Sequence, residues 1–315
     1  MENNLTLGID LGGTGIKMGI VNSQGKLLRT AKISTPSQGD ARLTTSMVVR
    51  EVNELLSSVG KTAIQGIGIG VAGDVDQAKG VVRMSPNLGW KNFPIRDYLA
   101  KYLKYPITVD NDANAAAWAA YVVETKKKVQ NLICVTLGTG IGGGIVLNGR
   151  LYHGATGSAG EIGHMTLFPQ GIQCKCGNYG CLERYVGARA MIVTAKEALN
   201  SGEKTLIRKL INNDLSRVTP MIIQEAGLKG DPLAIQLWAQ AGENLGVGLA
   251  SLINVLNPEI IILAGGLSRA GSLFLNPLKR TLLERAFAAP ARAVKIMISR
   301  MDQELGTVGA GLIAQ

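Results

Sequence analysis

The sequence predicts an α/β protein built from two similar lobes. The chain has 315 residues, more than a single hydrophobic core usually organises. A pattern of short strands and longer helices occurs twice along it, and each time two strands joined by a Gly-rich turn come first. We therefore expect mixed sheets flanked by helices, with a first lobe over residues 1–118, a second over 119–301 and a cleft between them. A C-terminal helix over residues 302–315 is expected to pack back on the first lobe.

The first half begins with three short apolar segments separated by Gly-rich or Asn-Ser-Gln-Gly turns, at residues 5–10, 16–21 and 26–34. This spacing predicts an antiparallel meander. Apolar residues then recur at three- and four-residue spacing over 47–59, as in a helix, and the next strand, 64–71, alternates Ile with Gly. A strand over 107–110 runs into an alanine-rich segment, 114–123, of strongly helical composition.

From residue 131 the same plan restarts. The expected strands lie at 132–137, 144–147, 259–264 and 294–299. Long helical stretches are expected near 187–200 and 232–256, and an apolar, Gly-rich helix over 306–314 closes the chain.

Composition and charge narrow the class of protein. Hydrophobic residues make up 46% of the chain and glycines number 40 without a collagen period, which indicates a globular protein with many tight turns. The formal charge of +10 suggests nucleic acid, but the one dense basic run, Lys126 to Lys128, has no interleaved aromatic residues, so we interpret it as solvated surface. The N-terminus has no basic segment followed by an apolar one, and no apolar run has the length of a membrane span. We expect a cytoplasmic protein without nucleic-acid or membrane partners.

The segment from Asp10 to Lys17 has the composition of a phosphate-binding turn. An acid ends the first strand, and backbone amides and a hydroxyl that can face phosphate oxygens follow, on Gly12, Gly13 and Thr14. The next element is a strand, which excludes a Walker A loop, because that loop opens a helix. An ordinary Gly-rich hairpin accounts equally well for this segment taken alone.

A second glycine-rich turn, over 137–144, contains a literal G-x-G-x-x-G whose candidate phosphate contacts are Gly138, Thr139, Gly140 and Gly142. A strand follows it, whereas a dinucleotide fold requires a helix there. A third pair, Gly265-Gly266, ends the strand 259–264, where ligands of α/β sheets commonly bind, although a turn leading into a helix explains it equally. The first two loops are expected to face one another across the cleft and hold a triphosphate.

These loops, together with the segments Asp-Asn-Asp-Ala-Asn-Ala at 110–115 and Gly-Glu-Ile-Gly-His at 160–164, resemble the sugar kinases of the actin-like ATPase (ribonuclease H-like) fold. In particular they resemble the ROK (repressor, open reading frame, kinase) family, over essentially the whole chain. The resemblance implies ATP-dependent phosphorylation of a hexose, with ATP and Mg²⁺ bound and Asp10 on the Mg²⁺ side, and a homo-oligomer, dimer or tetramer. Glucose is favoured because the cysteine segment has the form usual in ROK kinases of glucose.

Two alternatives accompany this resemblance. ROK kinases for other sugars, such as N-acetylmannosamine, share the same motifs. ROK regulators share the sugar domain but carry an additional N-terminal helix-turn-helix. Because the first phosphate loop begins at residue 10, where no helix-turn-helix domain is expected before it, and because Asp112 and the phosphate loops are intact, we expect a kinase rather than a regulator. A non-catalytic sugar sensor stays an open alternative.

Phosphoryl transfer to a hydroxyl needs a carboxylate that accepts its proton. Asp112 follows an apolar strand and begins an alanine-rich helix, so it is a candidate base, with helix capping by Asp112 or Asn111 as the alternative. The resemblance implies that Asp112 is the base and that sugar hydroxyls are bound by Asn111, Glu161, His164 and Glu183. Asn87 is a plausible wall residue or a turn residue. His153 has no motif role and is expected to be structural.

Four residues supply one nitrogen and three sulfurs, a complete tetrahedral set for structural Zn²⁺: His164, Cys174, Cys176 and Cys181. Gly177 and Gly180 permit the tight turns that bring the thiolates together. The set leaves no open coordination position, so the metal is expected to be structural, and one ring nitrogen of His164 can bind zinc while the other points at the sugar. Free buried cysteines are the alternative.

Overall fold

The computed structural model describes residues 4–36, 39–57, 64–301 and 304–315, and the chain divides into two compact units. Unit 1 comprises residues 1–134, 143–160 and 299–315, and unit 2 comprises residues 135–142 and 161–298. The first lobe was expected to end at residue 118, whereas unit 1 continues to residue 134 and takes in two later segments. Residues 58–59 of the first expected helix and residues 302–303 of the expected C-terminal segment lie outside the described residues.

Unit 1 contains the larger number of strands. They are β1 (Leu5–Leu11), β2 (Gly15–Val21), β3 (Leu27–Ser34), β4 (Ile64–Val71), β5 (Asp74–Asp76), β6 (Val81–Ser85), β7 (Trp90–Phe93), β8 (Ile107–Asn111) and β11 (Arg150–Leu151). Its helices are α1 (Ala41–Ser57), α2 (Ile95–Leu99), α3 (Asp112–Ala119) and α11 (Leu305–Ile313), with a π-helical turn over Ala120–Glu124. The border between the units passes through β9 (Leu132–Leu137) and β10 (Ile141–Leu147).

Unit 2 is mainly helical. Its helices are α4 (Glu183–Val186), α5 (Ala188–Asn200), α6 (Leu206–Leu210), α7 (Pro220–Leu228), α8 (Pro232–Leu256), α9 (Ser272–Arg285) and α10 (Ala288–Ala293). Its own strands are β12 (Ile260–Ala264) and β13 (Lys295–Ile298), which pair in parallel. The helix α8 packs closely against α9, because a Cβ on Gly246 would lie only 2.8 Å from the Leu278 carbonyl oxygen.

The first sheet has the strand order β3-β2-β1-β4-β8. The strands β1, β2 and β3 form the expected antiparallel meander, and β4 and β8 join β1 in parallel. The second sheet has the order β11-β10-β9-β12-β13, so the expected repetition of one strand plan is confirmed. Each sheet therefore presents the turn of its first hairpin, β1 to β2 or β9 to β10, in the same topological place.

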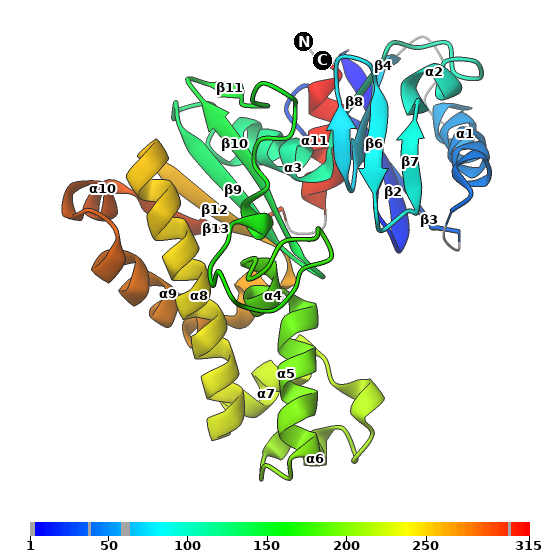
Figure 1. Cartoon of the computed structure of the whole chain (residues 1–315). Helices are drawn as coiled ribbons and strands as arrows, with labels where there is room; N and C mark the ends of the chain where they lie inside the picture. The colour runs from blue at the N-terminus through cyan, green and yellow to red at the C-terminus, as the bar shows by residue number, and fades with distance from the viewer. Residues whose placement is uncertain (1–3, 37–38, 58–63, 302–303) are drawn as a thin grey trace. The chain divides into compact units, whose positions relative to one another are not determined.

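The alternation of Ile and Gly in β4 has a packing cause. The helix α11 lies against β1 and β4 beside α3 (Figure 1), and a side chain on Gly8 or Gly68 would collide with its backbone carbonyls. A Cβ on Gly309 of α11 would in turn overlap the Ala115 carbonyl of α3. Glycine on both partners lets the helix backbone approach the sheet more closely than any side chain would permit.

The isoleucines of the same strands build the core of unit 1. Ile67 and Ile69 are fully buried with Val48 and Val52 of α1 and with residues of a small antiparallel sheet, β5-β6-β7. The sequence pattern does not predict this small sheet, because its strands have only three to five residues and lack a clear apolar alternation.

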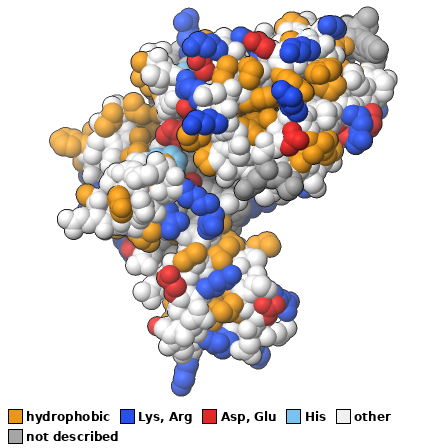
Figure 2. Space-filling view, turned by 45° about the vertical axis from the view of Figure 1, so that its right-hand side comes forward, with side chains coloured by type: hydrophobic (Ala, Val, Ile, Leu, Met, Phe, Trp, Pro, Cys, Tyr) orange, Lys and Arg blue, Asp and Glu red, His pale blue; other side chains and the backbone are white. Residues whose placement is uncertain are grey.

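Lys and Arg side chains do not gather into one patch on the face shown in Figure 2. They are dispersed among hydrophobic and acidic side chains there. Among the described helices, none combines the length and the apolar character that a membrane span requires.

Candidate active site and metal centre

The first Gly-rich turn closes the hairpin between β1 and β2. The Gly12 amide donates to the Gly15 carbonyl over 3.2 Å, and the Thr35 hydroxyl donates to the Gly12 carbonyl over 2.7 Å, so the turn is held from both sides. Thr14 is exposed at its tip. A Cβ on Gly13 would lie 2.8 Å from the Cβ of Asn87, so the turn and the Asn87 loop are in direct contact.

The charge of one acidic side chain near this turn raises the pKa of another. Asp10 is the last but one residue of β1 and pairs with Lys17 of β2. Burial and the nearby negative charge of Asp112 raise the pKa of Asp10 to about 6, although Lys17 lowers it. Burial also raises the pKa of Asp112. A divalent cation beside Asp10 would offset this repulsion, so the chemistry of the pair suits Mg²⁺.

The second Gly-rich turn is shorter than the sequence suggested. Only residues 138–140 form it, with the Gly138 amide donating to the Gly140 carbonyl over 3.0 Å, and Gly142 lies within β10. Gly138 and Thr139 are exposed. Because a strand follows the turn, the dinucleotide fold is excluded, as expected.

The second turn also makes a contact that the sequence did not reveal. The Ile141 amide donates to Glu183 Oε2 over 2.9 Å, and a Cβ on Gly140 would overlap that same carboxylate. The Ala188 amide donates to the Gly138 carbonyl over 3.1 Å. The expected sugar ligand Glu183 is thus attached to the expected phosphate turn.

The third glycine pair lies next to the second turn. Gly265 follows β12 with a φ of 90°, a conformation that favours glycine. A side chain there would collide with the carbonyl of Leu137, the last residue of β9. Gly266 begins a short 3₁₀ helix over Gly266–Ala270, and a Cβ on it would meet no atom of the described residues within 4 Å.

The question of which residue caps α3 is decided by the structure. Asn111 is the N-cap, and its Oδ1 accepts from the amides of Ala113 at 2.9 Å and Asn114 at 3.1 Å. Asp112 is the first helical residue, and its Oδ1 accepts from the Ala113 amide at 2.9 Å. Capping therefore does not require Asp112, whose half-buried carboxyl lies at the junction of β8 and α3. Asn111 also donates from Nδ2 to the Gly73 carbonyl over 3.0 Å.

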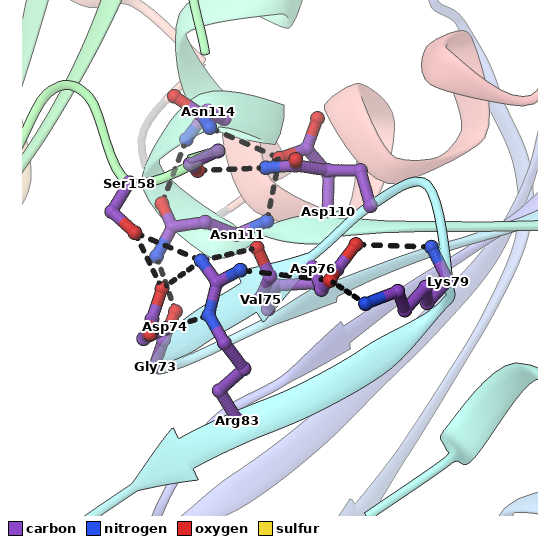
Figure 3. A network of polar contacts seen from close by, with 12 residues as sticks. Gly73, Asp74, Val75, Asp76, Lys79, Arg83, Asp110, Asn111, Asn114 and Ser158 are labelled. Carbon is purple, nitrogen blue, oxygen red and sulfur yellow. Dashed lines mark hydrogen bonds and ion pairs between the residues drawn. The ribbon is translucent and has the colours of Figure 1, made fainter. Parts of the chain in front are cut away.

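A network of polar contacts surrounds this junction, and the sequence pattern did not reveal the residue at its centre. Asp110, the residue before Asn111, is buried, and its Oδ1 accepts from the Asn111 amide and from Asn114 Nδ2 (Figure 3). Its Oδ2 lies 2.7 Å from Nε2 of His153. The available signals were an acid directly before the candidate base and a histidine outside every motif, but the two residues lie 43 positions apart and leave no local pattern.

The four expected zinc ligands come together in unit 2. The ligand atoms of His164, Cys174, Cys176 and Cys181 all lie within 4.8 Å of one another. Cys176 Sγ is 3.6 Å from Cys181 Sγ, and Cys174 Sγ is 3.7 Å from His164 Nδ1. Zn–S bonds of about 2.3 Å in a tetrahedron separate two sulfurs by roughly 3.8 Å, so the set fits Zn²⁺. The other ring nitrogen of His164, Nε2, lies 3.9 Å from Glu161 Oε2.

The backbone of the cysteine segment explains this convergence. The Cys174 amide donates to the Asn178 carbonyl over 2.7 Å, and Gly177 and Gly180 have φ of 96° and 70°. A side chain on Gly180 would collide with the Phe168 carbonyl. The Leu182 amide donates to the Met165 carbonyl, so the residue after His164 is hydrogen-bonded to the residue before Glu183.

The duplicated strand plan, with Gly-rich turns at corresponding hairpins, defines a protein of the actin-like ATPase fold class. Within it, residues 6–315 match the model of the ROK family, and the chain belongs to that family.

Several relatives align with nearly the whole chain. This chain is 33% identical over 316 residues to a glucokinase of Streptomyces coelicolor, and the alignment covers 99% of this chain and 98% of that one. A ROK family glucokinase of Streptomyces griseus, solved in complex with glucose and AMPPNP, superposes with a TM-score of 0.84 at 32% identity and 99% coverage of both chains. A xylose repressor of Caldicellulosiruptor bescii is 32% identical over 307 residues, 96% of this chain and 76% of that one.

Proposed function

We propose that this protein is an ATP-dependent hexose kinase that converts glucose to glucose 6-phosphate. The observation that carries the proposal is the junction of β8 and α3. Asn111 caps the helix, so the carboxyl of Asp112 is not required for capping and is available for chemistry. Full-length similarity to glucokinases supports the choice of reaction and of glucose.

The proposed roles follow the sugar's chemistry. Asp112 accepts the proton of the attacking hydroxyl, and Asn111, Glu161, His164 and Glu183 bind neighbouring hydroxyls, with Asn87 at the wall. Asn111 has little hydrogen-bonding capacity to spare, because its Oδ1 serves two amides and its Nδ2 the Gly73 carbonyl, which leaves one N–H for the sugar.

The nucleotide is proposed to bind through the two Gly-rich turns and the Gly265-Gly266 pair, as backbone amides suit phosphate oxygens. The Streptomyces griseus relative was solved with AMPPNP, a non-hydrolysable analogue of ATP, which supports ATP as the donor. Mg²⁺, held on the side of Asp10, would neutralise charge on the phosphates.

We further propose that the Cys₃His set holds a structural Zn²⁺. When bound, the metal would fix the ring of His164 through Nδ1 and leave Nε2 for Glu161 and the sugar. A cytoplasmic location stays a prediction from the N-terminal sequence and the lack of a membrane-length apolar run. A dimeric or tetrameric assembly stays a prediction from the family resemblance and is testable by sedimentation.

A sugar-responsive regulator is the second candidate, because the chain also resembles a xylose repressor along 96% of its length. A kinase for another hexose, such as N-acetylmannosamine, is the third. ADP release coupled to a panel of glucose, mannose, fructose, xylose and N-acetylmannosamine separates the three, with Asp112→Asn as the control for contaminating kinases. Glucose should give the highest kcat/KM. Binding of a sugar without any ADP release would favour a regulator.

A further inference from the structure

Asp110 and His153 have no role in the reaction proposed above, yet they form a short, largely buried hydrogen bond. The side chain of Asp110 is 6% exposed and that of His153 is 32% exposed, and Asp110 Oδ2 lies 2.7 Å from His153 Nε2. An ionised carboxylate can only accept, so the His153 ring donates from Nε2. The hydrogen bond to Asp110 raises the pKa of His153, which favours the charged, donating ring.

The other oxygen of Asp110, Oδ1, accepts three hydrogen bonds around the junction of β8 and α3. It accepts from the Asn111 amide at 2.7 Å, from Asn114 Nδ2 at 3.0 Å and from Gln77 Nε2 at 3.3 Å. Asn111 comes one residue before Asp112, and Asn114 comes two residues after it. The position of the Asp110 carboxylate therefore helps to fix the backbone that carries the candidate base. A buried carboxylate keeps such an arrangement only while its charge is compensated.

His153 belongs to a loop, residues 152–160, that runs directly into Glu161 and that we name the tether loop. Gln77 Nε2 also donates to the Gly157 carbonyl over 2.9 Å. Arg83 Nη2 donates to the Ser158 hydroxyl, which in turn donates to Asp74, both over 2.8 Å (Figure 3). The tether loop is thus fastened at three residues to the elements around the β8–α3 junction.

We propose that His153 is a positioning residue: through Asp110 it fixes the Asn111–Asp112 turn against the tether loop that leads to Glu161. The inference rests on the proposed function, since it assigns His153 to the same hexose site. A positioning role differs from a packing role because it requires the hydrogen-bond donor at Nε2 and not the shape of the imidazole ring. A side chain that keeps this donor should keep the site.

Two substitutions of His153 test this requirement. Glutamine places an N–H donor as far from Cβ as Nε2 of histidine does, whereas asparagine is one bond shorter and does not reach Asp110. His153→Asn should therefore lower kcat/KM for the hexose by about 10- to 100-fold, the range of a lost charge-assisted hydrogen bond, with ATP KM within about twofold. His153→Gln should remain within about threefold of the wild type. Thr156→Ala, at an exposed position of the same loop, is the control.

The readouts are steady-state kinetics for each substrate, hexose Kd by calorimetry, and thermal unfolding. Equal impairment of His153→Asn and His153→Gln, wild-type kinetics of His153→Asn, or a matching rise in ATP KM would each overturn the inference. Calorimetry tests the role of His153 separately from the kinase activity, because it measures hexose binding without turnover. A wild type that binds hexose without releasing ADP rejects the kinase activity, and the Kd values of the two variants then decide the role of His153. A wild type that neither binds nor phosphorylates any hexose rejects both.

Discussion

Replacing Gly140 by alanine should damage hexose recognition, although Gly140 lies in a turn assigned to the nucleotide. The added Cβ would overlap Oε2 of Glu183 and lie 2.8 Å from its Cδ. The carboxylate must move, and its 2.9 Å hydrogen bond from the Ile141 amide is lost. Gly138 offers a matched control two residues away, because a Cβ there meets no atom of the described residues within 4 Å. Neither glycine has a positive φ, so backbone strain does not separate the two variants.

The magnitude follows from the lost hydrogen bond. A bond to a charged acceptor contributes about 1.5–3 kcal/mol, which corresponds to roughly 10- to 150-fold in an equilibrium constant. Part of this loss is recovered if water solvates the displaced carboxylate, so we expect Gly140→Ala to raise hexose KM by about tenfold or more. Gly138→Ala should leave hexose KM within about twofold.

The assay is coupled ADP release with the hexose varied at saturating ATP, and then with ATP varied at saturating hexose. Thermal unfolding of both variants confirms that they fold. The reasoning is refuted if the two alanine variants raise hexose KM equally. It is also refuted if Gly140→Ala raises only ATP KM, because the turn rather than Glu183 would then have given way.

Three further predictions concern the base, the metal and the acid on β1. Asp112→Asn should bind hexose normally but lose roughly two to four orders of magnitude in turnover, the range of a positioned general base, and near-normal turnover would reassign Asp112 to a structural role. Cys176→Ser should lower the zinc content found by metal analysis, the melting temperature and hexose use, and a wild-type protein purified without zinc would contradict the four-residue centre. The raised pKa of Asp10, about 6 against 3.8, means that the folded metal-free protein binds more protons than the unfolded chain between these values, so its stability should fall as pH rises from about 4 to 6. Denaturant unfolding should show a smaller decline for Asp10→Asn than for the wild type, by at most about 3 kcal/mol, which a partly exposed carboxyl reduces. The raised pKa of Asp112 leaves part of the decline in both proteins. Parallel pH profiles of the two proteins would reject the prediction.

Local patterns in the sequence were enough for the fold. The turns near residues 12 and 139, the spacing of apolar residues in α1 and α8 and the alternation in β4 each lie within one element, where period and turn chemistry decide the structure. The two hairpins in corresponding places predicted a strand plan that repeats, and the order of the strands in the two sheets came from the structure. The small sheet β5-β6-β7 escaped prediction because strands of three to five residues are too short to show a period.

The residue types of the candidate site were likewise readable, because three cysteines within eight residues and an acid between a strand and an alanine-rich helix are local signals. The hydrogen-bond partners of these residues could not be read from the sequence. Whether Asn111 or Asp112 caps α3 depended on backbone dihedrals at one junction, and Glu183 reaches the Ile141 amide across 42 residues. His153 finds Asp110 across 43 residues, a contact that no local pattern of either segment encodes. Sequence patterns thus determined which elements form and which chemistry they carry, whereas only tertiary packing decided which polar groups meet, since a buried carboxylate takes whatever donors the fold brings within about 3 Å of it.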